Sequence, residues 1–182
     1  MTNSVLSAIA DRRSIRNYTG ELPTAEQLEA LKAAAVQSPS AVNRQPYHFT
    51  FVENKELLEE FKTDVRKAFK QNEPSAPAAG EDFDVLRGAP SVCFIFADPN
   101  NHWAMLDSGI AVENLALAAH SMGLGSVILG MPRIVFETNG EKWERLLACP
   151  EGMKFAIAIG IGVPAASKDA HPVREGLISV IK

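Results

Sequence analysis

The segment from Asp107 to Met122 limits the possible folds most, because it reads as a helix without a polar face. Alanine and leucine dominate it, which gives high helix propensity and small side chains. A helix would gather its few polar residues on one side, but Ile110 and Leu117 fall among them. Gly123 is well placed to end this helix as a left-handed cap, and a strand is expected over 126–129.

A helix of this kind must be covered on most of its surface. In one interpretation it is the central core helix of a monomer. In the other, a second copy of the chain supplies part of the cover. The helix alone leaves both interpretations open.

The 182 residues, 46% of them hydrophobic and 22% charged, suit a single globular domain over 1–182. A net charge of −4 argues against nucleic acid as the main partner, although a local cationic pocket is compatible with it. The first residues are too polar for a signal peptide, and no apolar run approaches the ~18 residues of a membrane span. We therefore expect a cytoplasmic protein with no membrane partner.

The sequence carries no familiar hydrolytic, phosphate-loop or metal-binding motif. Its two cysteines and four histidines are scattered without the spacing of metal ligands, so no metal is expected. If the protein is an enzyme, a cofactor carries the difficult chemistry.

Two polar segments are candidates for binding a cofactor. Arg12, Arg13, Ser14 and Arg16 follow a short helix expected over 4–10, and arginine forks match phosphate oxygens well. The alternative is a solvated helix end whose cations compensate the helix dipole.

The second polar segment runs from Ser38 into a strand expected over 47–53. Its members Ser40, Asn43 and Gln45 could read the polar edge of a flat heterocycle. An ordinary turn with satisfied amides is the alternative. The remaining periodicity predicts helices over 25–37, 54–70 and 134–147, and strands over 92–97 and 155–163. Thr24 and Gln27 have the spacing of a capping box at the start of the first of these helices.

Three motifs in order resemble the nitroreductase family of flavoproteins over nearly the whole chain. They are Arg12-Arg-Ser-Ile-Arg16, Ser38-Pro-Ser-x-x-Asn-x-Gln-Pro-Tyr-x-Phe49 and Gly109-Ile-Ala-x-x-Asn-Leu-x-Leu-Ala-Ala-x-x-x-Gly-Leu-Gly-Ser126. The resemblance implies an α+β fold with a central mixed β-sheet flanked by helices. It also implies an intertwined homodimer with two FMN sites at the subunit interface.

The resemblance also implies roles for individual residues. Arg12, Arg13 and Ser14 would hold the FMN phosphate and ribityl chain, with Arg16 nearby. Ser40, Asn43 and Gln45 would meet the ring or ribityl chain, some of them from the other subunit. Tyr47 stands where tryptophan is common in the family, and it keeps the aromatic surface.

Two further segments acquire roles from the resemblance. Ile128, Leu129 and Gly130 would pass beside the reactive middle of the flavin, with a backbone N–H near N5. The C-terminal tail would supply a cation to the phosphate and add an edge strand to the partner's sheet. Arg174 is the first choice for that cation and Lys168 the reserve.

The activity implied is transfer of hydride from NADH or NADPH through flavin N5 to an electron-poor acceptor, a nitroaromatic or a quinone, with ping-pong kinetics. No side chain is nominated as general acid or base. Alternatives are a specialised flavin reaction such as reductive dehalogenation, a flavin-binding protein without turnover, and a non-flavin interaction protein. The segment 71–84 either borders the substrate entrance or only connects its neighbours.

Overall fold

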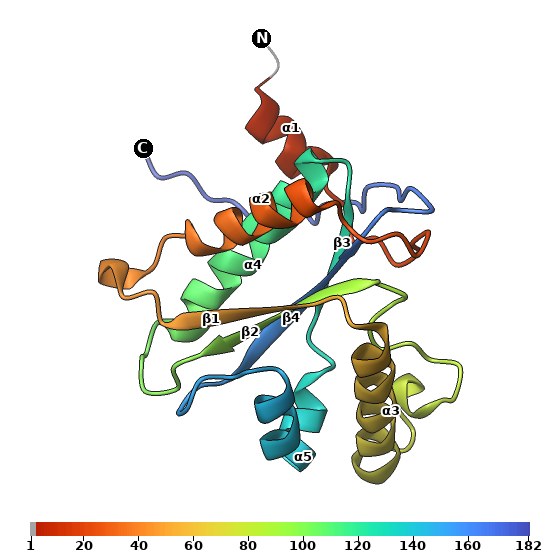
Figure 1. Ribbon diagram of the computed structural model, residues 1–182. Coiled ribbons are helices and arrows are strands. Elements are labelled where there is room, and N and C mark those ends of the chain that lie inside the picture. Colours follow the sequence, from red (N-terminus) through yellow and green to blue (C-terminus); the bar gives the residue numbers. More distant parts are fainter. Residues whose placement is uncertain (1–2) are drawn as a thin grey trace.

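A four-stranded sheet forms the middle of the protein in the computed structural model, which describes residues 3–182 (Figure 1). Its strand order is β1-β2-β4-β3, and each neighbouring pair is antiparallel. Parallel pairing occurs at the isolated bridge between Ser14 and Ser126. A mixed sheet, with parallel and antiparallel pairs, was expected. Among the described residues, this bridge is the parallel part. The strands are β1 (Tyr47–Val52), β2 (Ser91–Ala97), β3 (Gly125–Leu129) and β4 (Lys154–Gly162).

Helices cover both faces of the sheet, which gives the expected α+β architecture. On one face lie α1 (Ser4–Asp11), α2 (Ala25–Val36) and α4 (Ala104–Ser121), and on the other α3 (Lys55–Asn72) and α5 (Arg133–Leu146) (Figure 1). Short 3-10 turns, η1 (Ala41–Asn43) and η2 (Pro77–Ala79), lie in the connections. None of the described helices has the length and apolar character needed to cross a membrane.

Each face of the sheet has its own hydrophobic core. Phe61 and Trp143 pack edge to face beneath one face, with ring centroids 4.8 Å apart. Leu31 and Leu115 join α2 to α4 in the core of the other face. Strand β2 is buried along its whole length because it lies between these two cores.

Several local signals in the sequence are confirmed. Thr24 and Gln27 form a reciprocal capping box at the start of α2. Gly123 has a φ of +77° just after α4, as a left-handed cap requires. Gly162 is a point of close approach, because a Cβ atom there would lie 2.5 Å from Cδ of Pro90.

The end of the chain lies apart from the sheet. The strand expected there was to join a partner's sheet, and in the single chain residues 166–182 form no strand and the last residues are exposed. A strand requires a neighbouring backbone, and no strand within residues 3–182 pairs with the tail. Figure 1 shows the C-terminus projecting away from the sheet. The tail carries five exposed large apolar side chains: Val173, Leu177, Ile178, Val180 and Ile181.

Candidate functional site

The arginine-rich segment after α1 lies against the edge strand β3. The backbone N–H of Ile15 donates to the carbonyl of Ser126 at 2.9 Å, and Ser14 forms its bridge with the same residue. A Cβ atom on Gly125 would lie 2.9 Å from Ile15, so this close packing requires glycine. The fold therefore fixes the segment's backbone beside the sheet.

Tyr18 fixes the same segment from its other end. Its hydroxyl donates to the carbonyl of Ile15 at 2.9 Å. Burial raises the pKa of Tyr18 well above its ordinary value, against the opposing influence of the Arg16 charge. The hydroxyl thus remains a neutral donor at physiological pH.

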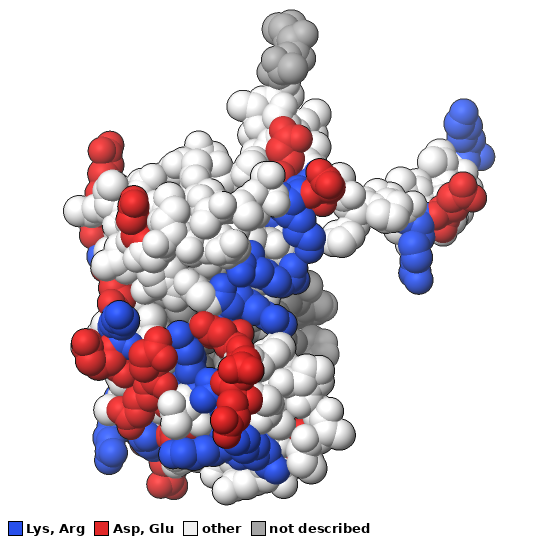
Figure 2. Space-filling view, turned by 90° about the vertical axis from the view of Figure 1, so that its right-hand side faces the viewer, with Lys and Arg blue, Asp and Glu red and all other residues white. Residues whose placement is uncertain are grey.

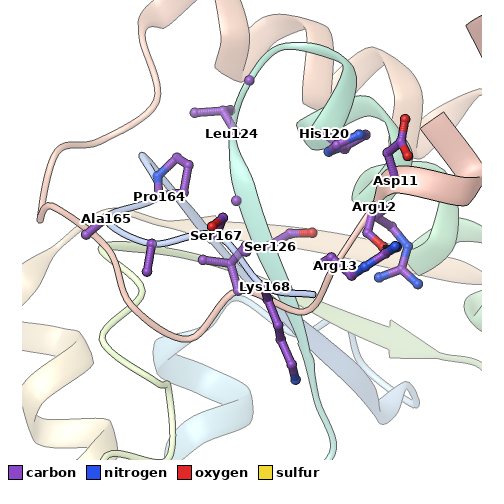
Figure 3. Close-up of a pocket in the computed structure, with 14 residues that line it drawn as sticks. Asp11, Arg12, Arg13, His120, Leu124, Ser126, Pro164, Ala165, Ser167 and Lys168 are labelled. Atoms are coloured by element: carbon purple, nitrogen blue, oxygen red, sulfur yellow. Dashed lines mark hydrogen bonds between the residues drawn. The ribbon is translucent and has the colours of Figure 1, made fainter. Parts of the chain in front are cut away.

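A cavity of about 510 Å³ opens between this segment and the C-terminal segment. Of the described residues that line it, four are cationic and none is acidic: Ile9, Ala10, Arg12, Arg13, Ser14, Arg16, Lys168, Ala170, His171 and Val173. An adjoining hollow of about 500 Å³ shares Arg12, Arg13 and Lys168, and reaches Ser126 and His120 (Figure 3). Figure 2 shows Lys and Arg side chains gathered below the N-terminal segment on this side of the molecule.

The cations of the site are engaged to different degrees. Nε of Arg12 lies 3.1 Å from Oε1 of Glu113 on α4. The two side chains form an ion pair, but the N–H of Nε does not point at the carboxylate and makes no hydrogen bond. Arg13 donates through Nη1 to the carbonyls of Ala10 and Arg12, at 2.6 and 2.7 Å. Arg13 therefore caps the end of α1, as the helix-dipole alternative supposed, while it also lines the cavity.

Lys168 and His171 enter the cavity from the C-terminal segment. Within residues 3–182, the ion pairs do not include Lys168, so its charge is available to an anion. Arg174, the first choice from the sequence, lies in the exposed tail and is not among the residues that line this cavity. His171 was not anticipated, and its position three residues after Lys168 is the only signal that could have suggested it.

Ile128, Leu129 and Gly130 are not among the described residues that line the cavity or the adjoining hollow; they lie further along the chain from Ser126, at the end of β3. Ile128 is 41% exposed and Gly130 is exposed, whereas the side chain of Leu129 is buried in the core. Only the backbone of Leu129 can therefore meet a ligand here. An elongated ligand with an anionic end and a flat apolar part would match this combination.

The C-terminal end of the segment 71–84 lies next to the arginine-rich segment. Asp82, Phe83 and Asp84 line a hollow of about 360 Å³ together with Arg16. The guanidinium carbon of Arg87 lies 4.4 Å from the centroid of the Phe83 ring. The segment thus adjoins the cationic cluster.

Ser40, Asn43 and Gln45 do not line this cavity. Ser40 precedes η1, Asn43 ends it and Gln45 follows it. In Figure 1, η1 lies at the far left, with α2 and α4 between it and β3. Gln45 donates through Nε2 to Oδ1 of Asn43 at 3.0 Å, and its backbone N–H donates to Oγ of Ser40 at 2.8 Å. One chain therefore brings together the arginines, Ser14, Lys168 and the edge of β3, but not this second polar segment.

Comparison with known proteins shows the family to which this chain belongs. Residues 9–162 match the model of the nitroreductase family. A provisionally named NADH dehydrogenase/NAD(P)H nitroreductase of Archaeoglobus fulgidus is 35% identical over 91% of this chain and 88% of that relative. Iodotyrosine deiodinase of Thermotoga neapolitana is 24% identical over 92% of each chain. A nitroreductase of Desulfitobacterium hafniense, solved with bound FMN, has a TM-score of 0.93 and 29% identity, with both chains fully covered.

Proposed function

Because the chain belongs to the nitroreductase family, we propose that it is an FMN-dependent oxidoreductase that takes reducing equivalents from NADH or NADPH. The observation that carries this proposal is the cavity with four cationic side chains, whose adjoining hollow reaches Ser126 on β3. In the similar structure from Desulfitobacterium hafniense the bound group is FMN. FMN has an anionic end and a flat ring, so its shape and charge fit the cavity and the strand edge.

Arg12, Arg16 and Lys168 would hold the phosphate, because cationic donors form strong hydrogen bonds to an ionised phosphate. Arg13 and Ser14 would add donors at the ribityl side. The ring would lie against the exposed side chain of Ile128 and against Gly130, where the absence of a side chain lets the backbone approach. These assignments follow the family resemblance, and the charges that line the cavity and the exposure of Ile128 and Gly130 support them.

When bound, FMN supplies a two-electron carrier that accepts hydride from a nicotinamide and passes it to an acceptor. The residues named above would bind the phosphate and orient the ring. We propose that electron-poor nitroaromatics or quinones take the place of the nicotinamide after it has left, which gives ping-pong kinetics. Phe83 and Arg87 adjoin Arg16, so the 71–84 segment would border the acceptor's entrance.

We further propose that the working unit is a homodimer with one FMN site at each end of the interface. The outer side of α4 leaves Met105 and Leu106 exposed and Ile110 and Leu117 half-buried. Water-exposed apolar side chains along one helix favour cover by a second copy. In that arrangement Ser40, Asn43 and Gln45 of the partner would complete the site that one chain leaves open.

The tail and the free edge of β1 fit the same dimer. A groove of about 610 Å³ runs along β1, lined by residues that include Tyr47, Phe49 and Phe51. Strand β1 is at the edge of the sheet, so its outer backbone groups can pair with another strand. The apolar tail of a second copy would fill this groove as an added strand.

A visible spectrum of the purified protein tests cofactor binding, and anaerobic mixing with NADH or NADPH tests turnover. Bleaching of the flavin absorbance at catalytic rates, followed by recovery with a quinone or nitroaromatic, is the expected result. Persistent colour would indicate binding without turnover, and a colourless protein that takes up no FMN would refute the proposal. Release of iodide from iodotyrosine, with no quinone reduction, would favour reductive dehalogenation instead.

A further inference from the structure

The segment around η1 has a backbone conformation that must be held in place. Val42, Asn43 and Gln45 have φ values of 50°, 53° and 49°, in the left-handed region that glycine favours. None of the three is glycine, so the chain does not prefer this shape by itself. Such conformations persist where surrounding contacts determine them.

Asp107 supplies one of those contacts from the first turn of α4. Its side chain is buried, and both carboxylate oxygens lie 3.2 Å from the backbone nitrogen of Ala41, the first residue of η1. The ion pairs among residues 3–182 do not include Asp107. Its charge is therefore directed at the Ala41 N–H and stabilised by the positive end of the helix dipole.

Asn114 holds the start of the same segment two helical turns later. Its Nδ2 donates to Oγ of Ser38 at 3.0 Å, and the hydroxyl of Tyr47 donates to the carbonyl of Ser38 at 2.7 Å. The spacing of seven residues places Asn114 on the same side of α4 as Asp107. One helix thus holds the segment at two points, Ser38 and Ala41.

A purely structural role explains these contacts poorly. A buried carboxylate is costly to desolvate, and an apolar side chain of similar size would stabilise a core at least as well. The part of the segment beyond the contacts does not enter the core, because Asn43 and Gln45 are exposed. What the contacts determine is the direction of exposed amide groups.

We propose that Asp107 and Asn114 are positioning residues for FMN. They hold the 38–45 segment so that Ser40, Asn43 and Gln45 are preorganised to meet the flavin of the partner subunit. Neither residue touches the cofactor itself. This inference rests on the proposed function, and it means that α4 of each chain shapes the cofactor site of the other.

The test compares FMN binding and backbone protection in four variants of the full chain. Asp107→Ala and Asn114→Ala remove the contacts, and Asp107→Asn retains an acceptor for Ala41. Ser108→Ala is the matched control, because Ser108 is equally buried on α4 and its hydroxyl donates only to Ala104 of the same helix. Each variant is titrated with FMN, and amide hydrogen exchange is followed at Ala41.

Asp107→Ala should raise the Kd for FMN by about tenfold or more, the effect of losing one charge-assisted hydrogen bond. It should also speed exchange at Ala41, while Asp107→Asn recovers both properties and Ser108→Ala changes neither. If Asp107→Ala does not fold, Asn114→Ala decides the matter, because loss of its contact with Ser38 should also raise the Kd for FMN.

FMN binding by the wild-type protein distinguishes failure of the positioning role from failure of the proposed function. If wild type binds FMN and the folded Asp107→Ala and Asn114→Ala variants bind it with the same Kd, the positioning role is refuted and the proposed function stands. Equal weakening by Ser108→Ala would also refute it, because the effect would then follow from any disturbance of α4. If wild type binds no FMN, the proposed function fails and this inference fails with it.

Discussion

Replacing Arg12 with alanine should weaken FMN binding without unfolding the protein. Arg12 lines the cationic cavity, and its side chain is 27% exposed beside Glu113. Loss of a hydrogen bond to a charged group costs about 1.5–3 kcal/mol, which corresponds to a factor of about 10 to 150 in Kd. Glu113 already neutralises part of the Arg12 charge, so we expect a value near the lower end, about tenfold.

The assay is titration of apoprotein with FMN, followed by the change in flavin fluorescence. Arg145→Ala is the matched control, because Arg145 is an exposed arginine in the last turn of α5, on the opposite face of the sheet. It removes the same charge, so a general electrostatic effect would appear in both variants. An unchanged Kd for Arg12→Ala, or equal weakening in both variants, would refute the assignment of Arg12 to the phosphate.

Three other perturbations test the dimer, the packing and an ion pair. Deleting residues 173–182 should shift the protein from dimer to monomer in sedimentation experiments and lower flavin retention; a dimer with full flavin content would contradict the role given to the tail. Gly162→Ala should destabilise the fold by about 1–3 kcal/mol in urea denaturation, because the added Cβ overlaps Pro90; an unchanged urea midpoint would contradict this. Partial burial would raise the pKa of Asp64, but hydrogen bonds from Lys142 and Lys67 outweigh it and lower the pKa. The resulting stabilisation is present above about pH 4 and is lost as the pH falls through the depressed pKa, so Asp64→Asn should flatten the acid side of the stability profile; an unchanged profile would count against the ion pair.

The sequence predicted those parts of the fold that depend on local chemistry. The capping box at Thr24 and the left-handed turn at Gly123 follow from neighbouring residues, and both are confirmed. The apolar character of α4 left open how it is covered, and the exposed Met105 and Leu106 show that one chain does not cover it completely. The family itself was recognisable because three motifs occur in order along the chain.

The parts that sequence reasoning did not reach depend on contacts between distant segments. An irregular tail has no periodicity, so spacing could not show that Lys168, and not Arg174, lines the cavity. The expected terminal strand is absent from the described tail, because a strand needs a partner that this chain does not pair with it. Asp107 gave no signal, since an acidic residue in the first turn of a helix is ordinary until the packing shows which amide it meets.

Sedimentation velocity followed through the visible absorbance of flavin tests the central claim most directly. If two chains jointly form the cofactor site, the absorbance should sediment with a species of twice the 19.7 kDa chain mass. Flavin that sediments with the single chain, or that remains unbound, would contradict the account.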